Sequence, residues 1–409
     1  MQASISDYQK IIGKEHLETI YRIAERLSGK RVKMVNSTSV GGGVAEILYR
    51  FIPLMNELGI QTFWEVIKGD GEFFNITKSI HNSLHGKEEP LTPQMEKNFI
   101  EVNRTNARSM NFDEDYVFIH DPQPIALIEE KDKHRAKWIW RCHIDVSSPL
   151  ESVWNFLKNY VEMYDASIFS APNFARMLKI HQYQIPPSID PLSPKNREVR
   201  PREIESTLKK YKLNPERPII TQVSRFDKLK DPLGVIETYK LVKKTTDCQL
   251  ILAGGTATDD PESVQILPQI LSFAEGDPDI HIIELPPNSD LDVNILQRAS
   301  TIILQKSLKE GFALTVTEAL WKKKPVVASA VGGIPLQVIH NYTGLLVHSV
   351  EGAAYKIRYL LSNPDLARRL GENGYQHVRH NFLITRHLRD YLLLLIALDH
   401  PGENIINLG

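Results

Sequence analysis

The sequence predicts an α/β protein with two doubly wound domains, each built around a parallel sheet. Three observations lead to this prediction. The chain has 409 residues, enough for two or three domains. Short apolar runs alternate with helical patterns along nearly the whole chain, as they do in βαβ units. A proline-rich stretch, Ile185–Pro194, separates the two halves and cannot continue a helix.

The expected strands are short, continuous apolar runs, which are typical of parallel strands buried on both faces. Helix-like segments lie between them, because parallel neighbours need a crossover connection. In the first half we expect strands at Val32–Val35, Val117–Ile119, Trp138–Ile144 and Ile168–Ser170, and helices at 45–58 and 149–163. In the second half we expect strands at Ile219–Val223, Gln249–Ala253, Ile280–Leu285, Thr301–Leu304, Pro325–Ala328 and Leu345–Val347, and helices at 233–244, 264–273, 291–300, 315–322 and 353–361.

These patterns place a first domain at 1–213 and a second domain at 214–385, with a short helix at 202–211 in the connection. A terminal helical pattern at 386–400 comes too late to belong obviously to the second sheet. Ligands of doubly wound folds bind beyond the carboxyl ends of the strands. We therefore expect the two domains to face a cleft, lined by the loops that follow their strands.

Composition narrows the possible partners. Lys and Arg number 49 against 50 Asp and Glu, a net charge of -1, which argues against nucleic acid held by overall positive charge. The two cysteines, Cys142 and Cys248, cannot form a disulfide framework and suit a reducing compartment. The first residues lack the apolar core of a signal peptide, and no apolar run approaches the ~18 residues of a membrane span. We expect a soluble, cytoplasmic protein without a membrane partner.

A glycine-rich loop follows the first expected strand and opens a helix. It contains Gly41, Gly42 and Gly43, which permit close backbone approach, and the helix start offers N–H groups to an anion or a hydroxyl. The spacing is neither G-x-G-x-x-G nor a Walker loop, so it implies neither a dinucleotide nor ATP hydrolysis. A tight strand-to-helix turn is the alternative interpretation.

Two cations follow the first strand of the second half. Arg225 carries a planar fork suited to phosphate oxygens, and Lys230 carries a mobile point charge. Together they could neutralise a pyrophosphate. The alternative is that both side chains are simply solvated.

A Glu-x7-Glu pair, Glu310 and Glu318, brackets the start of an expected helix near Leu314. Carboxylates there can accept hydrogen bonds from sugar hydroxyls, while the N–H groups of residues 312 to 314 can face a phosphate. Acidic residues at a helix start also complement the helix dipole, and this simpler role is the alternative.

Other candidates also follow expected strands. His120 and Asp121 end one strand of the first half, and His143 and Asp145 end another. The neighbouring Cys142 and His143 point to opposite faces of a strand, so a nucleophile pair is not expected. The histidines lack metal-ligand spacing, and no metal site is predicted. Gly254 in the second half fits either a nucleotide contact or a plain turn.

Taken in order, these loops resemble those of the retaining GT-B glycosyltransferases, in the large family that contains sucrose and glycogen synthases. The similarity covers essentially the whole chain. It implies that the terminal helix, residues 386–409, crosses back and joins the first domain. The segments His120–Pro124 and Trp140–Pro149 look most like the members that join glucose from a nucleoside diphosphate donor to free glucose, giving trehalose reversibly. One departure is Ala313, where the family usually has glycine. Its methyl group puts rate and donor preference in doubt.

The resemblance implies roles for the candidate residues, with no metal and no cofactor. The implied catalytic residues are Arg225, Lys230, Glu310 and His143. The implied donor-binding residues are Gly43, Gly254, Gly311, Phe312, Ala313, Leu314 and Glu318, with Glu318 on the ribose hydroxyls. The implied acceptor-binding residues are Gly42, His120, Asp121 and Asp145. The partners are then a nucleotide sugar and glucose, and a homodimer is implied as well.

Three alternatives remain open at this point. A trehalose phosphorylase-like enzyme that uses glucose 1-phosphate would keep Arg225, Lys230 and Glu310 but would have little use for Glu318. A nucleotide-sugar epimerase shares the two-domain build and would convert its donor without an acceptor. A sugar-binding protein without catalysis would bind the donor and never turn it over.

Overall fold

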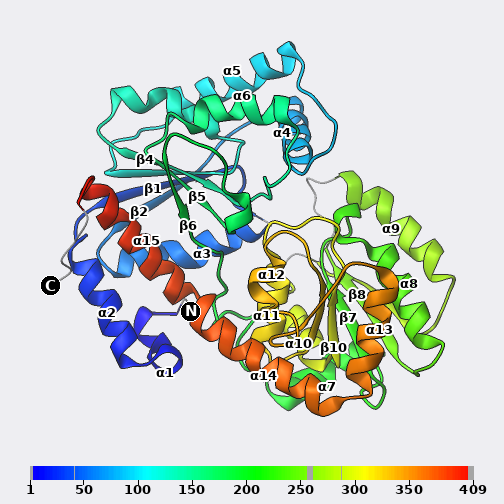
Figure 1. The fold of residues 1–409 in the computed structure, drawn as a ribbon. Coiled ribbons are helices and arrows are strands. Elements are labelled where there is room, and N and C mark those ends of the chain that lie inside the picture. The colour runs from blue at the N-terminus through cyan, green and yellow to red at the C-terminus, as the bar shows by residue number, and fades with distance from the viewer. Residues whose placement is uncertain (1–2, 41, 256–260, 287, 404–409) are drawn as a thin grey trace. The chain divides into compact units, whose positions relative to one another are not determined.

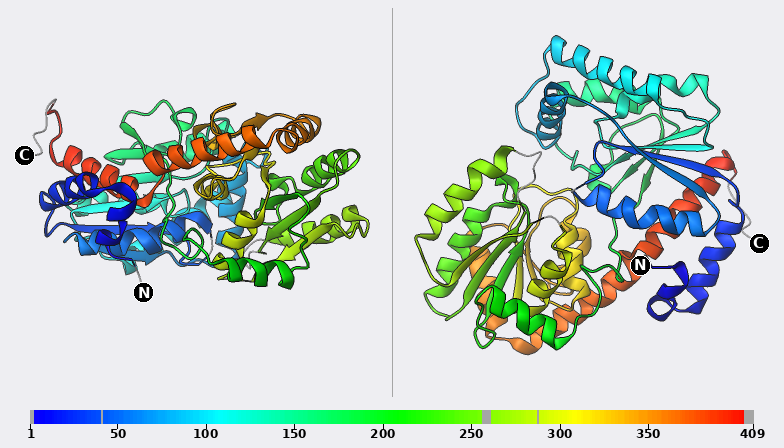
Figure 2. Two further views of the ribbon diagram at one scale, coloured as in Figure 1. Left: turned by 90° about the horizontal axis from the view of Figure 1, so that it is seen from below. Right: turned by 180° about the vertical axis from the view of Figure 1, so that it is seen from behind.

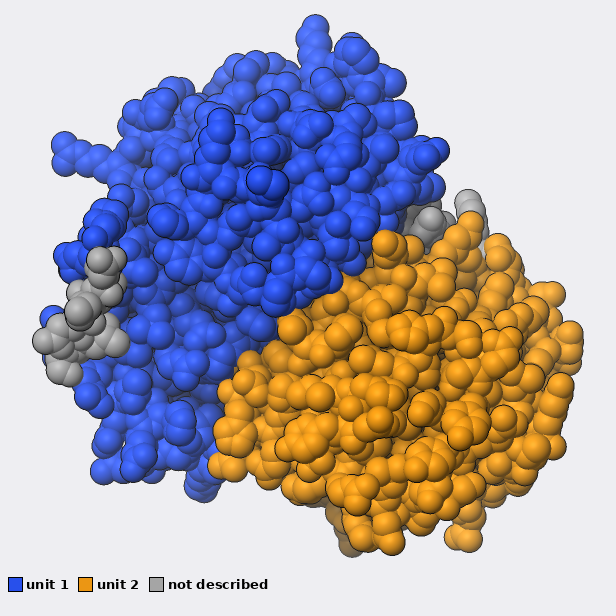
Figure 3. All heavy atoms as spheres, viewed as in Figure 1, with its two compact units in different colours: residues 1–188, 384–409 blue, residues 189–383 orange. Residues whose placement is uncertain are grey.

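The computed structural model describes residues 3–40, 42–255, 261–286 and 288–403, with residues 261–265 described by their backbone alone. The chain forms two α/β units, each with helices on both faces of a sheet (Figures 1 and 2). Unit 1 comprises Met1–Ser188 and Ile384–Gly409, and unit 2 comprises Ile189–Leu383 (Figure 3).

The boundary predicted at residues 213 and 214 lies inside unit 2. The segment after Ile189 packs on unit 2, because the side-chain amide of Asn294 donates to the carbonyl oxygens of Pro194 and Arg197, both at 2.8 Å. Helix α7 (Pro201–Lys210) then packs against α10 (Asp290–Ala299) of the same unit. The division between the units therefore falls inside the proline-rich stretch, between Ser188 and Ile189, about 25 residues before the predicted boundary.

Unit 1 contains a six-stranded sheet in which all neighbouring strands are parallel, in the order β2-β1-β3-β4-β5-β6. The four inner strands include every strand expected in this half, although β4 ends at Cys142, before the expected end at Ile144. The two edge strands, β2 and β6, were not predicted, because they are partly exposed and carry polar residues. The bounds are β1 Arg31–Asn36, β2 Gln61–Val66, β3 Tyr116–His120, β4 Lys137–Cys142, β5 Ala166–Phe169 and β6 His181–Gln184.

Helices cover both faces of this sheet. Helices α4, α5 and α6 lie on one face, and α2, α3 and α15 lie on the other (Figures 1 and 2). Of these, α2, α4 and α5 were not predicted. The bounds are η1 Ile5–Tyr8, α1 Gln9–Ile12, α2 Lys14–Glu25, α3 Gly42–Glu57, α4 Gly71–Leu84, α5 Pro93–Ser109, η2 Ile125–Lys133, α6 Glu151–Val161, η3 Pro172–Phe174 and α15 Ile384–Asp399.

Unit 2 contains a second parallel six-stranded sheet, in the order β12-β11-β10-β7-β8-β9, and the sequence predicts all six of its strands. These strands are β7 Ile219–Val223, β8 Gln249–Gly254, β9 Ile280–Glu284, β10 Ile302–Gln305, β11 Val326–Ser329 and β12 Leu345–Val347. The remaining helices are η4 Lys228–Lys230, α8 Pro232–Lys243, α9 Pro261–Ala274, α11 Leu314–Trp321, α12 Ile334–Gln337, α13 Val350–Leu361 and α14 Pro364–Asn381.

The apolar core of unit 2 lies on both faces of the sheet. One cluster joins the strands to α8 and α13 through residues such as Val235, Tyr239 and Ile357. A second cluster joins the opposite face to α7 and α10 through Leu208 and Leu296. With both faces covered, the strands read as continuous apolar runs, which explains why this half was predicted well.

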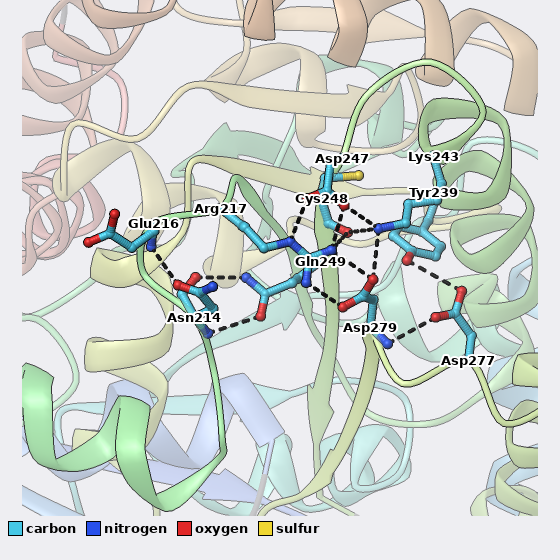
Figure 4. A network of polar contacts seen from close by, with 10 residues as sticks. All are labelled: Asn214, Glu216, Arg217, Tyr239, Lys243, Asp247, Cys248, Gln249, Asp277 and Asp279. Atoms are coloured by element: carbon cyan, nitrogen blue, oxygen red, sulfur yellow. Dashed lines mark hydrogen bonds and ion pairs between the residues drawn. The ribbon is translucent and has the colours of Figure 1, made fainter.

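An ion-pair network joins the segments that directly precede β7, β8 and β9, at the amino ends of these strands (Figure 4). Arg217 forms two bonds to Asp247, at 2.8 and 2.6 Å, and two to Asp279, at 2.5 and 2.7 Å. Lys243 adds bonds to the same two carboxylates, at 2.6 and 2.7 Å. Hydrogen bonds from Arg217 hold the pKa of Asp279 well below its usual range. The network therefore ties three strand starts together by charge.

Both sheets have a point at which the strand order reverses. It lies between β1 and β3 in unit 1 and between β7 and β10 in unit 2. In open parallel sheets the crevice at this point, beyond the carboxyl ends of the strands, is where ligands bind. The loops after these four strands contain most of the candidate residues. Within the described ranges, every helix is too short or too polar to span a bilayer.

Candidate active site

In unit 2, the loop after β7 presents Arg225 and Lys230. The carboxylate of Asp227 accepts a hydrogen bond from the backbone N–H of Lys230, at 3.2 Å, and lies 3.4 Å from the Arg225 guanidinium. The buried Gln222 amide donates to the carbonyl oxygen of Lys230, at 2.8 Å. These bonds fix a short 3-10 turn at Lys228–Lys230, so the two cations stand on an ordered loop.

The loop after β10 meets the loop after β7. Lys230 Nζ forms an ion pair with the Glu310 carboxylate, and the backbone N–H of Leu308 donates to the carbonyl oxygen of Leu229, at 2.7 Å. Both members of the ion pair are mostly buried, with side-chain exposures of 18% for Lys230 and 7% for Glu310. Two residues far apart in the sequence are thus brought together, at the place where β7 and β10 are neighbours.

The backbone around Glu310 is held by close contacts that only glycine allows. A Cβ atom on Gly332 would lie 1.6 Å from the carbonyl oxygen of Glu310, and one on Gly333 would lie 2.7 Å from that of Gly311. The buried Gln337 amide donates to the carbonyl oxygen of Phe312. Neither the two glycines nor Gln337 was predicted from the sequence, although a Gly-Gly pair that follows an expected strand indicates a close approach of the backbone.

Ala313 lies in the left-handed region, with φ 72° and ψ 73°, immediately before α11. This conformation costs a residue with a Cβ atom about 1 kcal/mol relative to glycine. The neighbouring N–H groups of Phe312 and Leu314 stand at a helix start, where backbone donors have no partner within the helix. The position usually filled by glycine is therefore a strained one in this chain.

Glu318 is fully buried on α11, and neither of its carboxylate oxygens has a hydrogen-bond partner among the described residues. The nearest described cation is Lys195, whose Nζ lies 3.6 Å from Oε1. Buried carboxylates are normally hydrogen-bonded, because desolvation without a partner costs several kcal/mol. The two carboxylate oxygens, which have no hydrogen-bond partner among the described residues, can therefore accept hydrogen bonds from a ligand.

Lys306 is a further cation that the sequence analysis missed. It directly follows β10, its side chain is buried, and its Nζ lies 3.1 Å from Asp231 Oδ2. Its backbone N–H donates to Gln222, at 2.8 Å. Since Asp231 also caps α8, Lys306 supports the end of the turn that carries Lys230.

Gly254 ends β8, where the loop after β7 passes very close. A Cβ atom there would lie 1.8 Å from the carbonyl oxygen of Ser224. This close approach explains why the position needs a glycine for the fold. The predicted contact of Gly254 with a nucleotide stays a prediction.

In unit 1, the glycine loop leads from β1 into α3. Gly41 lies outside the described residues. Gly42 has a positive φ of 75° and, with Gly43, begins α3 at an exposed position. The prediction of a glycine turn that opens a helix agrees with these two residues.

His120, Asp121 and His143 come together at the carboxyl ends of β3 and β4. Asp121 has φ 64°, and its Oδ1 accepts a hydrogen bond from the backbone N–H of His143, at 2.7 Å. This bond draws the chain out of the strand after Cys142, which explains the early end of β4. His120 Nδ1 lies 3.0 Å from His143 Nε2, and the planes of the two rings differ by 15°.

Burial sets the charge of these groups. It lowers the pKa of His120 to about 3, with a further contribution from the Arg141 guanidinium. It also lowers the pKa of His143 well below its usual value, again with Arg141 contributing. Burial raises the pKa of Asp121 to about 7, against the opposing effects of the His143 N–H and Arg141. Both imidazoles are therefore neutral at physiological pH.

Arg141 was not predicted as a site residue. It is fully buried on β4, its Nη2 lies 3.3 Å from Ser170 Oγ, and its Nε and Nη1 have no hydrogen-bond partner among the described residues. Asp145 is buried too, but its Oδ1 accepts from the backbone N–H of Ser147, at 2.9 Å, and so stabilises its own loop. Burial raises the pKa of the Cys142 thiol well above its usual value, which argues against a thiolate nucleophile.

A small cavity adjoins the histidines of unit 1. It is lined by His120 and His143 and, from the terminal helix α15, by His387 and Tyr391, two residues that were not predicted from the sequence. Four side chains of α3 complete it: Val44, Ile47, Leu48 and Phe51.

The structure thus brings Arg225, Lys230 and Glu310 close together within unit 2. Within unit 1 it brings together His120, Asp121 and His143, while Gly43, a donor candidate, also lies in unit 1. The predicted cleft between the units stays a prediction. Within the described ranges, no three His, Cys, Asp or Glu side chains are grouped so that they could hold a metal ion.

Comparison with known proteins identifies the family. Residues 34–176 match the model of the trehalose synthase N-terminal domain, and residues 203–377 match that of glycosyl transferases group 1. The chain is 49% identical over 398 residues to a trehalose synthase of Thermococcus litoralis, covering 96% of each chain. It is 30% identical to a trehalose phosphorylase of Pleurotus pulmonarius, covering 98% of this chain and 62% of that protein.

Solved structures support the fold. An α,α-trehalose-phosphate synthase (UDP-forming) from Burkholderia xenovorans superposes with a TM-score of 0.74 at 13% identity, covering 91% of this chain and 100% of that one. With two parallel α/β sheets and relatives that match along its whole length, this chain belongs to the trehalose synthase family of GT-B glycosyltransferases.

Proposed function

We propose that this glycosyltransferase moves glucose from a nucleoside diphosphate glucose to free glucose, giving α,α-trehalose in a reversible reaction that retains configuration. The observation that carries the proposal is the buried carboxylate of Glu318, one helical turn beyond the loop that holds Glu310, which has no hydrogen-bond partner among the described residues. A nucleotide donor supplies ribose hydroxyls to satisfy such a group, and the Lys195 ammonium lies 3.6 Å from it.

Donor binding would replace the ion pair between Lys230 and Glu310. Lys230 would turn to the diphosphate with Arg225, and Glu310 would accept hydrogen bonds from hydroxyls of the transferred glucose. The N–H groups at the start of α11, around Phe312, would face the same phosphates. Each member of the ion pair thus holds the other in place until the substrate provides the better partner.

In the transition state, negative charge grows on the leaving diphosphate. Two cations on an ordered loop and a helix start stabilise that charge without reorganising, which is usually the largest catalytic contribution. The leaving phosphate oxygen takes the proton of the acceptor hydroxyl, so acceptor and leaving group share one face and configuration is retained. Glu310 positions the sugar and is not the nucleophile. Because Arg225 and Lys230 supply the positive charge, we propose no metal and no cofactor.

Unit 1 would supply the acceptor side. We propose that Gly42, His120, Asp121 and Asp145 contribute to glucose binding and that His143 supports the reacting sugar. The two free, buried cysteines suit a reducing compartment, in agreement with a cytoplasmic enzyme. We propose a homodimer and no nucleic-acid or membrane partner.

The test uses the purified protein with labelled glucose and a panel of nucleoside diphosphate glucoses. Formation of labelled α,α-trehalose from at least one donor is the expected result. Failure to form any disaccharide from any donor would refute the proposal.

The alternative is a phosphorylase that uses glucose 1-phosphate, favoured only by the more distant phosphorylase relatives. Glu318→Ala separates the two functions, with the exposed Glu237→Ala on α8 as a control. For the proposed reaction we expect kcat/KM for the nucleotide donor to fall about 100-fold, because the ribose loses a charge-assisted bond. An unchanged rate would favour the phosphorylase.

A further inference from the structure

A chain of three side chains in unit 1 ends at His143. Met34 on β1 lies with its Sδ 3.4 Å from Nε2 of His120 on β3. His120 Nδ1 lies 3.0 Å from Nε2 of His143, just beyond β4. Met34 and His120 are buried, and the three residues come from neighbouring positions of the sheet. These three side chains therefore lie on, or directly beside, adjacent strands of the sheet.

The chemistry of Met34 fixes the direction of every hydrogen bond in this chain. A thioether sulfur can only accept a hydrogen bond, so Nε2 of His120 carries the proton that points to it. In a neutral imidazole the other nitrogen is then an acceptor, which makes Nδ1 of His120 the acceptor for His143. His143 must therefore carry its proton on Nε2, and its Nδ1 keeps a lone pair.

This assignment requires that both rings be neutral, and their surroundings make them so. The titratable and charged groups that face the pair are Asp121, Arg141 and, from α15, His387 and Tyr391. Burial and the Arg141 guanidinium lower the pKa of both histidines. A second proton on either ring would also place two N–H groups against each other at the 3.0 Å contact.

We propose that His120 is a positioning residue that holds His143 in the Nε2–H tautomer, so that His143 Nδ1 accepts a hydrogen bond from a substrate hydroxyl. The substrate part of this inference rests on the proposed function. Asp121 fixes the backbone of His143 from the other side through the 2.7 Å bond to its N–H. No described residue forms a recorded hydrogen bond with His143 Nδ1, and the ring lines the cavity beside α3. A residue argued from sequence to bind the acceptor thus acts through its neighbour.

The first measurement observes the tautomer directly. Full-length protein labelled with 15N in its histidines is studied by long-range 1H–15N correlation, with His143→Gln used to assign the ring. In the native protein we expect a protonated Nε2 and an unprotonated Nδ1 on His143. We expect Met34→Leu, which removes the sulfur acceptor at similar volume, and His120→Leu to give a mixture of the two tautomers. The exposed His181→Leu serves as a control and should change nothing.

The second measurement is the rate of glucosyl transfer in the same variants. Loss of an orienting partner commonly costs 10–100-fold, so we expect His120→Leu to lower kcat/KM by about that factor. His120→Asn retains an acceptor oxygen near the position of Nδ1, and we expect it to lose less than about tenfold. A merely structural role of His120 would change rate and stability without moving the tautomer.

Two results would overturn the inference: a proton on Nδ1 of His143 in the native protein, or an unchanged single Nε2–H tautomer in both His120→Leu and Met34→Leu. These outcomes differ from failure of the proposed function. A native protein that makes no trehalose but shows the Nε2–H tautomer would refute the function and leave the tautomer assignment in place.

Discussion

Unit 1 should unfold steeply as the pH falls below about 6, because it buries three neutral histidines. Burial lowers the pKa of His120, His143 and His387, the last with the help of Arg386. An unfolded histidine takes up a proton near pH 6.5. Below that pH the unfolded chain binds more protons than the folded one, so acid favours unfolding.

The size of the effect follows from the proton count. Each extra proton bound by the unfolded state changes the free energy of unfolding by about 1.4 kcal/mol per pH unit. Three histidines contribute three protons between about pH 6 and the lowered pKa values. Asp121 acts in the opposite direction, because its pKa is about 7 in the folded state and about 4 in the unfolded chain. Between these two values the folded state binds a proton that the unfolded chain does not bind. Two net protons give about 3 kcal/mol per pH unit between roughly pH 5.5 and pH 4.5.

Over the one pH unit from 5.5 to 4.5 this loss would reach about 3 kcal/mol, a large fraction of the roughly 5–15 kcal/mol that stabilises a typical domain. The assay is urea denaturation at several pH values, followed by tryptophan fluorescence. Four of the five tryptophans lie in unit 1 and the fifth is Trp321 in unit 2, so a Trp321→Phe background reports unit 1 alone. This choice avoids treating a two-unit chain as one transition.

Two variants should move the slope in opposite directions. His120→Asn removes one titrating histidine and should lower the slope by about 1.4 kcal/mol per pH unit. Asp121→Asn removes the opposing group and should raise the slope by about the same amount. If the stability of unit 1 were flat between pH 6 and pH 4.5, or if both variants shifted the slope in the same direction, the reasoning would be wrong.

Three further predictions concern unit 2. Ala313→Gly should stabilise it by about 0.5–1 kcal/mol, because glycine tolerates the left-handed backbone, and the shift in urea denaturation followed by far-UV circular dichroism measures this. Gly254→Ala should weaken donor binding at least tenfold in calorimetry, because the new Cβ atom displaces the Ser224 carbonyl and the loop after it. Asp279→Asn should cost about 1 kcal/mol at neutral pH. Since the pKa of Asp279 is lowered, its contribution is present above about pH 4 and fades in acid, so the difference from native protein should shrink as the pH falls.

The parts of the fold that the sequence reveals are those where burial leaves a local pattern. All six strands of unit 2 are continuous apolar runs with helices on both faces, and each was predictable. The edge strands β2 and β6 are partly exposed and polar, so no apolar run marks them. Helix α4 does carry a local pattern, because Phe73, Ile76, Ile80 and Leu84 are buried at helical spacing, so it could have been predicted and was missed.

Some residues of the candidate site could likewise be predicted from the sequence, and others could not. Residues placed directly after strands, such as Lys230 and Glu310, could be selected because parallel strands gather their carboxyl ends at one edge. The residues that contact and orient the candidate side chains could not be selected from the sequence. Met34 lies within a strand like any core residue, and Lys195 lies in a proline-rich connection. Their roles depend on strand register and on the path of a loop, which only the coordinates reveal.

The network of Arg217, Lys243, Asp247 and Asp279 stands at the amino ends of the strands, while the donor loops stand at the carboxyl ends of the same sheet. Heat tolerance and turnover can therefore be adjusted independently in this unit. Charges can be added or removed at the amino ends without changing the loops at the carboxyl ends, which carry the proposed donor-binding residues.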